Sequence, residues 1–167
     1  DLDSGFITQE KVYELIKSFL KTLHSDNWYR SDKFLGDTGQ VIVLGGKYYD
    51  EYGEYYFYND LTYMFIRALN ELQLTDPKIV LRVSNETPSD LIDLSLEAIN
   101  TGIGSPLFSN DEVIIDKMIE FGYDKSDAIN YIISDCWEPT TLSNGLEQNN
   151  LGSFSFLNVT LTPGPTG

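Results

Sequence analysis

The alternation of short β-branched runs with amphipathic segments constrains the fold of this chain more than any other feature. The apolar runs "QVIVLGG" at 40–46 and "KIVLRVS" at 78–84 predict buried strands, and "YIIS" at 131–134 predicts a further one. Apolar residues recur at helical spacing around these runs. The predicted helices span 8–24, 59–72, 89–100 and 111–121, with a short one from Ser126. This order predicts an α/β fold in which right-handed β/α units surround a parallel sheet.

The ends of two predicted helices carry residues suited to capping. Gly102 and Gly122 each follow a predicted helix, and each glycine is expected in a left-handed conformation. Asn110 is expected to cap the start of the helix at 111–121. Asp111 comes next, where a negative charge suits the positive end of the helix dipole.

A tyrosine-rich segment, "YYDEYGEYYFYND" at 48–60, lies between the first strand and the second helix. It has two interpretations. One is a surface loop or hairpin whose rings pack on the helix that follows. The other is an aromatic, acidic binding loop.

The composition excludes several classes of function. The chain has 26 acidic and 11 basic residues and a formal charge of −15, so nucleic acid and anionic membrane surfaces are not expected partners. No apolar run approaches the roughly 20 residues that span a bilayer, and a soluble, cytoplasmic protein is expected. With one cysteine and one histidine, neither an internal disulfide nor a metal site is expected.

Three predicted strands are few for a parallel sheet, because both faces of such a sheet must be covered. The chain begins at Asp1 without a methionine and ends in the turn-rich "LTPGPTG". We therefore expect a part of a larger sheet or barrel, with 161–167 as a flexible or added tail.

The single cysteine lies in "YIISDCWEP" at 131–139, between two acidic residues. Cys136 has three interpretations, of which the first is a small buried hydrophobe. The second, a thiolate nucleophile, is disfavoured because Asp135 and Glu138 oppose a further negative charge. The third is a neutral thiol that gives and takes a hydrogen atom. In an extended segment Cys136 and Glu138 face the same side, which would place the thiol beside a carboxylate base.

Over nearly its whole length the sequence resembles the glycyl radical enzymes, the family of pyruvate formate-lyase. The resemblance lies in the succession of the blocks "DLDSGFITQEKVYELIKSFL", "VIVLGG", "NDLTYMFIRALNEL", "DPKIVLRVSNETP", "GIGSPLFSNDEVI" and "FGYDKSDAINYIISDCWEP". The family fold is a ten-stranded β/α barrel made of two antiparallel half-barrels of five parallel strands, with the cysteine loop in its interior. The resemblance implies that 1–160 form part of such a barrel domain, a half-barrel portion that ends after the cysteine loop.

The resemblance also implies catalytic roles. Cys136 would become a thiyl radical that abstracts hydrogen from a substrate carbon bearing a hydroxyl group. Glu138 matches the general base of dehydratases and related lyases, and would accept the hydroxyl proton while a neighbouring group leaves. Cys136 would then return its hydrogen to the product radical.

Four further residues are candidates for the substrate pocket. Asp135 stands where lyases of the family usually have glycine, so it could alter the loop or contact the substrate. Trp137 would wall the pocket or face the surrounding core. Asn110 and Asp111 match a family "ND" element near the active cavity, and helix capping explains them equally well.

The resemblance implies a glycyl radical installed by a radical-SAM iron–sulfur activating enzyme. "LRVSN" at 81–85 lacks the glycine of the family's radical loop, so no cofactor is expected in this chain and the radical is expected elsewhere in a complete protein. The expected substrate is a small hydroxylated molecule, and the complete enzyme is expected to be a homodimer in an anaerobic bacterium. Pyruvate formate-lyase itself has two adjacent cysteines. The single one here favours a lyase of the glycerol or diol dehydratase or choline lyase kind.

Two alternatives to this enzyme remain open. The first is a non-catalytic α/β module of the same scaffold that binds a small ligand or a partner subunit. The second is a split enzyme whose glycine loop comes from another chain.

Overall fold

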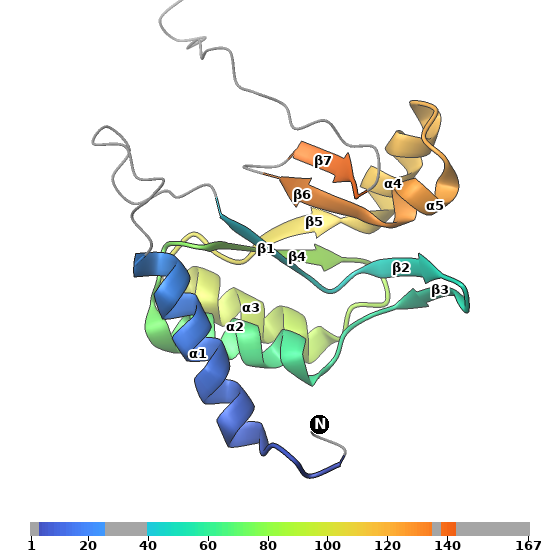
Figure 1. The fold of residues 1–167 in the computed structure, drawn as a ribbon. Helices are drawn as coiled ribbons and strands as arrows, with labels where there is room; N and C mark the ends of the chain where they lie inside the picture. Colours follow the sequence, from blue (N-terminus) through green and yellow to red (C-terminus); the bar gives the residue numbers. More distant parts are fainter. Residues whose placement is uncertain (1–3, 26–39, 135–137, 143–167) are drawn as a thin grey trace, which may run out of the picture.

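The computed structural model describes residues 4–25, 40–134 and 138–142, which form layers of helices and strands (Figure 1). The helices are α1 (Gln9–Ser25), α2 (Asp60–Leu72), α3 (Ser89–Asn100), α4 (Asp111–Glu120) and α5 (Lys125–Ile129). The strands are β1 (Val41–Leu44), β2 (Lys47–Asp50), β3 (Gly53–Tyr56), β4 (Lys78–Val83), β5 (Leu107–Asn110), β6 (Tyr131–Ser134) and β7 (Glu138–Thr141). The predicted α/β class is confirmed, and the predicted helices lie within a few residues of the observed ones.

The central sheet is parallel and has the order β1-β4-β5. Ile42 of β1 pairs with Ile79 of β4, and Leu81 of β4 pairs with Phe108 of β5. The sequence predicted 131–134 as the third strand of this parallel sheet. That placement was wrong, because residues 107–110 form the third strand. The run "LFSN" is too short to show a period. It becomes a strand because β4 offers it an edge to pair with.

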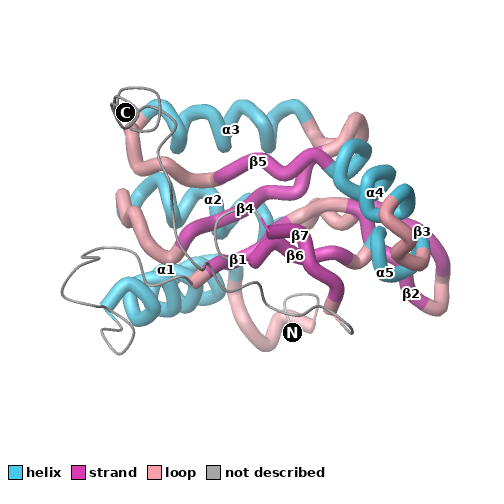
Figure 2. The backbone as a smooth tube through the Cα atoms, turned by 90° about the horizontal axis from the view of Figure 1, so that it is seen from above, coloured by secondary structure: helices cyan, strands magenta, loops and turns pink. Residues whose placement is uncertain are grey.

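The predicted strand at 131–134 exists as β6, but it pairs antiparallel with β7 and lies against one face of the sheet (Figure 1). Helices α1, α2 and α3 cover the other face. Seen from above, the β6–β7 hairpin lies over β1 (Figure 2), and β6 contacts β1. A buried parallel sheet needs cover on both faces, and the hairpin with α4 and α5 supplies the second one.

Two apolar cores result, one on each side of the sheet. On the helix side, Leu20, Ile66 and Leu91, one from each of the three helices, pack with Ile79 and Leu81 of β4. Burial of each such side chain stabilises the fold by about 1.5–3 kcal/mol.

On the hairpin side, the second core joins the sheet to the hairpin. Val80 of β4 packs with Ile115 and Met118 of α4 and with Tyr131 and Ile133 of β6. Successive residues of β4 therefore serve opposite faces, as the period of a strand requires.

The predicted helix ends are confirmed. The Asn110 side chain accepts a hydrogen bond from the backbone N–H of Val113 at 3.0 Å, which caps α4. Gly102 and Gly122 have φ angles of 86° and 95°, in the region that favours glycine.

Part of the tyrosine-rich segment forms the β2–β3 hairpin, which confirms the predicted hairpin, whereas the packing of its rings on the helix that follows stays a prediction. Its rings contact one another: Tyr48 stacks on Tyr55 at 6.3 Å between ring centroids, and Phe57 lies edge-on to Tyr48 at 6.0 Å. Asn130 follows α5, and its side-chain amide binds the backbone of Tyr49 twice: Oδ1 accepts from the Tyr49 N–H at 2.9 Å, and Nδ2 donates to the Tyr49 carbonyl oxygen at 2.8 Å. The hairpin is thereby held beside α5.

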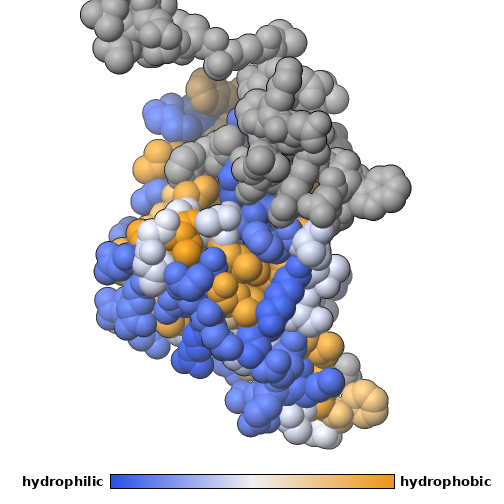
Figure 3. Space-filling view, turned by 90° about the vertical axis from the view of Figure 1, so that its left-hand side faces the viewer, coloured by the Kyte–Doolittle hydropathy of each residue, from blue (hydrophilic) through white to orange (hydrophobic). Residues whose placement is uncertain are grey.

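The side of the molecule that lies at the left of Figure 1 is mostly hydrophilic, with apolar side chains gathered near its middle (Figure 3). The parallel strands begin at this side and run away from it (Figure 1). Among the described helices, none is long and apolar enough to cross a membrane.

The chain passes very close to Arg82 where β1 ends. Gly46 has a φ angle of 100°, and a Cβ atom at this position would lie 2.6 Å from Cβ of Arg82 and 2.9 Å from Oδ2 of Asp111. Side chains rarely adopt this backbone conformation, and no space exists for one here. Glycine is therefore required for both reasons at once.

We predict that Gly46→Ala lowers the free energy of unfolding by about 3 kcal/mol, because it adds a steric clash to backbone strain. Gly53→Ala is the matched control: Gly53 has a φ angle of 113°, but nothing lies within 4 Å of its added Cβ. The control should lose only the strain, about 1 kcal/mol. Urea unfolding measures both variants, and equal losses would contradict the close approach at Gly46.

Candidate functional site

A buried ion pair lies at the carboxyl ends of the parallel strands. Arg82 in β4 has no exposed side-chain surface, and Asp111 at the start of α4 has 2%. The guanidinium donates from Nε to Oδ1 of Asp111 at 2.8 Å and from Nη2 to Oδ2 at 3.1 Å. This two-bond geometry is the strongest that an arginine and a carboxylate can form.

The remaining donors of Arg82 bind backbone carbonyl groups of three other segments. Nη1 donates to the carbonyl oxygen of Tyr131 at 3.0 Å, and the two N–H groups of Nη2 are shared between Asp111, at 3.1 Å, and the carbonyl oxygens of Ile129 and Lys47, each at 2.9 Å. One side chain of β4 thus joins the start of β2, the end of α5 and the start of β6.

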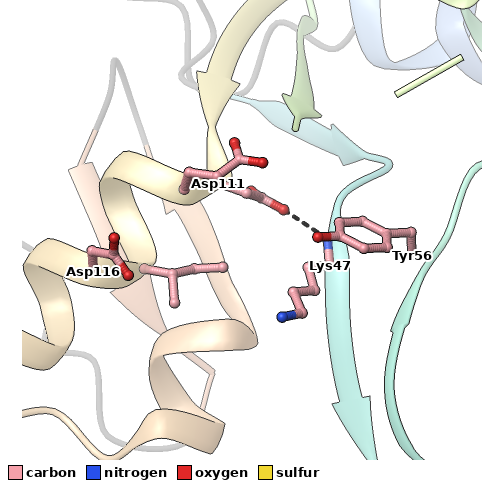
Figure 4. Close-up of a pocket in the computed structure, with 6 residues that line it drawn as sticks. Lys47, Tyr56, Asp111 and Asp116 are labelled. Carbon is pink, nitrogen blue, oxygen red and sulfur yellow. Dashed lines mark hydrogen bonds between the residues drawn. The ribbon is translucent and has the colours of Figure 1, made fainter. Parts of the chain in front are cut away.

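The carboxylate of Asp111 accepts two more hydrogen bonds. The backbone N–H of Lys47 donates to Oδ2 at 2.6 Å, the bond drawn in Figure 4. The hydroxyl group of Tyr131 donates to Oδ1 at 2.7 Å. Four protein donors therefore surround this carboxylate, and their number offsets the cost of burying its charge.

Tyr131 completes the group that we call the Arg82 network, which consists of Arg82, Asp111 and Tyr131. Its ring centroid lies 3.9 Å from Cζ of Arg82, and its hydroxyl oxygen lies 2.9 Å from Oγ of Ser109. Burial, and then the charge of Asp111, raise the pKa of Tyr131. The phenol therefore stays protonated at neutral pH and can donate to Asp111.

A pocket of about 140 Å³ opens beside Asp111 (Figure 4). It is lined by Lys47, Tyr56, Asp111, Glu112, Ile115 and Asp116. The ammonium group of Lys47 binds Glu54 at 2.6 Å, and this hydrogen bond raises the pKa of Lys47. Within the described ranges, no three metal-ligating side chains gather as a metal site would require.

The two neighbouring pocket candidates are placed differently. Asp111 lines the pocket of Figure 4 and belongs to the Arg82 network. Asn110 does not line that pocket; its exposed side chain caps α4. Their proximity to a substrate stays a prediction.

Glu138 is the first residue of β7 and is half-buried. It pairs with Ser134, and alternate pairs of the hairpin point to opposite faces. Tyr131 and Ile133 point to the core, so Glu138 lies on the face of the hairpin away from the Arg82 network. The other predicted site residues, Asp135, Cys136 and Trp137, lie outside the described residues, and their roles stay predictions.

Sequence reasoning missed Arg82, Tyr131 and Ser109. The sequence does contain a signal for Arg82, because a permanently charged side chain inside the apolar run "KIVLRVS" requires a buried partner. Nothing local identifies which of the acidic residues is that partner. Asp111 was expected to complement the helix dipole or to lie near a substrate pocket, and not to pair with Arg82.

We predict that Asp111→Asn lowers the free energy of unfolding by about 3–5 kcal/mol, because Arg82 would be left buried without a counter-charge. Asp116→Asn, an exposed change on the same helix and at the same pocket, should stay within about 0.5 kcal/mol of the parent. Thermal or urea unfolding measures both. The double variant Arg82→Met/Asp111→Leu should be less destabilised than Arg82→Met alone. A double variant that is worse than the single one would contradict the pairing.

Comparison with known proteins places this geometry in a family. The chain is 25% identical over 148 residues to isethionate sulfite-lyase of Oleidesulfovibrio alaskensis. The aligned region covers 83% of this chain and 17% of that enzyme. A solved structure on 1,2-propanediol dehydration in Roseburia inulinivorans matches with a TM-score of 0.75 and 33% identity, over 84% of this chain and 18% of that one. The glycerol-bound B12-independent glycerol dehydratase of Clostridium butyricum matches with a TM-score of 0.72 and 30% identity, over 81% of this chain and 18% of that one.

The chain therefore spans less than a fifth of the length of these relatives. The family model described as pyruvate formate lyase-like matches residues 1–164, which is almost the entire chain. The relatives are lyases and dehydratases. The chain belongs to the pyruvate formate lyase-like family of glycyl radical enzymes.

Proposed function

We propose that this chain is part of a glycyl radical lyase or dehydratase in which Cys136 and Glu138 act on a small hydroxylated substrate. The observation that carries the proposal is the β6–β7 hairpin. Ser134 and Glu138 pair at its end, and three residues with Cys136 in the middle join them. Because consecutive Cα atoms are about 3.8 Å apart, the Cα atoms of Cys136 and Glu138 are within about 7.6 Å of each other. This spacing supports the proposal, because a hydrogen carrier and a base at these two positions would be within reach of one substrate.

In the proposed reaction, Cys136 as a thiyl radical takes a hydrogen atom from the substrate carbon that bears the hydroxyl group and becomes a thiol, which leaves a substrate radical. Glu138 accepts the proton of that hydroxyl group while the neighbouring substituent leaves with its electron pair. Cys136 then returns the hydrogen atom to the product radical. Such a base contributes typically 10²–10⁴-fold to the rate. The half-buried position of Glu138 supports this role, because the residue is neither in the core nor fully in solvent.

A glycyl radical, in another part of the complete protein, would accept the thiol hydrogen atom of Cys136 and so leave a thiyl radical there. We propose that a radical-SAM iron–sulfur activating enzyme installs it, and that the complete protein is a homodimer in the cytoplasm of an anaerobic bacterium. The family membership supports these assignments.

We further propose that residues 1–160 belong to a ten-stranded β/α barrel domain, followed by a tail at 161–167. Among the described strands, β1 and β5 each have a neighbour on one side only. Further strands at these edges would continue the sheet into such a barrel. The similarity to the two dehydratase structures supports this arrangement.

Four residues are proposed to shape the substrate pocket. Asp135 and Trp137 flank the cysteine in sequence. Asn110 uses its side-chain oxygen to cap α4 and keeps an amide N–H group that can donate to a substrate. Asp111 acts indirectly, because its carboxylate already accepts four hydrogen bonds from the protein.

We predict that Cys136→Ser and Cys136→Ala abolish turnover of the complete, activated protein, because neither side chain can replace the thiol as a hydrogen carrier. The measurement is product formation from glycerol, 1,2-propanediol, isethionate and trans-4-hydroxy-L-proline under anaerobic conditions, after the glycyl radical has been quantified by electron paramagnetic resonance. Turnover that survives in either variant would refute the mechanism. A parent protein that acquires no radical would favour the non-catalytic module.

We also predict that Glu138→Gln lowers kcat by about 10²–10⁴-fold at unchanged radical content, because the amide cannot accept the hydroxyl proton. Glu97→Gln is the matched control, since Glu97 is exposed on α3. Its kcat should equal that of the parent. A Glu138→Gln variant with parental kcat would assign the base to another residue.

A further inference from the structure

Tyr131 is bound to the sheet by both its backbone and its side chain. Its carbonyl oxygen accepts from Nη1 of Arg82 at 3.0 Å, and its hydroxyl group donates to Asp111 at 2.7 Å. Arg82 and the backbone of Lys47 supply the other three hydrogen bonds to the same carboxylate, and of the four only the hydroxyl bond comes from a side chain of β6. Besides helping to satisfy the buried charge, it is a directional bond between the start of α4 and the first residue of β6.

We propose that Tyr131 is a positioning residue, whose hydroxyl group fixes the β6–β7 hairpin on the sheet and so places Glu138 for proton transfer. The inference deepens the proposed function and rests on it. Tyr131 acts through the hairpin and is not itself expected to touch the substrate.

The hairpin offers a short and direct connection between the two residues. Tyr131 pairs with Thr141, and Glu138 pairs with Ser134 at the other end of the same four-residue ladder. At about 3.4 Å per residue, Glu138 is only about 10 Å along the hairpin from the point of attachment. A displacement of the hairpin at Tyr131 therefore displaces Glu138 by a similar distance.

Apolar contacts alone would constrain the position and orientation of the hairpin less tightly. The side chain of Ile133 packs with Val80, Ile115 and Met118. Such burial is non-directional and tolerates small displacements, whereas hydrogen bonds constrain both distance and angle. The bonds of the Tyr131 hydroxyl to Asp111 and Ser109 supply this constraint at one end of the hairpin.

The variant Tyr131→Phe tests the proposal, because it keeps the ring beside Arg82 and removes only the hydroxyl bonds. Tyr58→Phe is the matched control. The hydroxyl group of Tyr58 also lies close to Arg82, bound to Thr87 at 2.8 Å, to Ser84 at 3.2 Å and to the carbonyl oxygen of Arg82 at 3.3 Å, but it has no bond to the described strands β6 and β7. Both variants lose a partly or fully buried hydroxyl group, so a general loss of stability affects both.

The first measurement is hydrogen exchange of the complete protein before activation, followed by mass spectrometry of peptides that cover β6 and β7. Tyr131→Phe should exchange its hairpin amides about tenfold faster than the parent, as expected for one lost hydrogen bond of ordinary strength. Tyr58→Phe should leave those peptides within about twofold of the parent. Equal exchange in the two variants would overturn the proposal.

The second measurement is kcat of the activated protein per glycyl radical, at a temperature where every variant is folded. A displacement of about 1 Å at a reacting group can cost about 10²-fold, so kcat of Tyr131→Phe should fall by about 10–10²-fold while KM stays within about twofold. A parental kcat would show that the residue has a structural role only, and would overturn the proposal. If Tyr131→Phe does not fold, Ser109→Ala, which removes one of the two hydroxyl contacts, should show the same pattern at about two- to threefold.

The two proposals fail in different ways. A parent protein without a radical or turnover refutes the proposed function, and hydrogen exchange then still decides whether the hydroxyl group fixes the hairpin. An active parent whose Tyr131→Phe variant is equally active refutes only the positioning role.

Discussion

The buried ion pair between Arg82 and Asp111 is the interaction on which the rest of the described structure depends. Removing two charges from water costs several kcal/mol for each ion, and this cost is offset only if all their hydrogen-bonding groups find partners. Here the partners come from β2, α5 and β6. The hydrogen bonds that stabilise the buried charges therefore also hold three segments, distant in sequence, around the end of β4.

The backbone beside the pair is shaped by the same requirement. The Lys47 N–H and carbonyl groups both bind the pair, which pulls the chain at Gly46 into contact with Arg82. Only a residue without a side chain can adopt this path. The two apolar cores then form on either side of β4, and Tyr131 links one of them directly to the polar centre.

Membership in the pyruvate formate lyase-like family gives this architecture a meaning that stability alone does not. The polar centre lies on the core side of the β6–β7 hairpin, and Glu138 lies on the opposite face. A rigid attachment on one face, with Glu138 on the other, suits an element that presents reactive groups to a substrate. The ion pair and the proposed base Glu138 would then lie on opposite faces of the β6–β7 hairpin.

The sequence by itself determined the family, the helices α1 to α4 and the strands β1 and β4, because block order, periodicity and caps such as Asn110 are local properties of the chain. Only the tertiary structure decided that 107–110 enters the sheet while 131–134 leaves it to cover a face. It also decided that Asp111, by sequence a first-turn charge, is the partner of Arg82. The contacts of Arg82 with Asp111 and Tyr131 join residues 29 and 49 positions apart. Their energies depend on burial, which no local sequence pattern records.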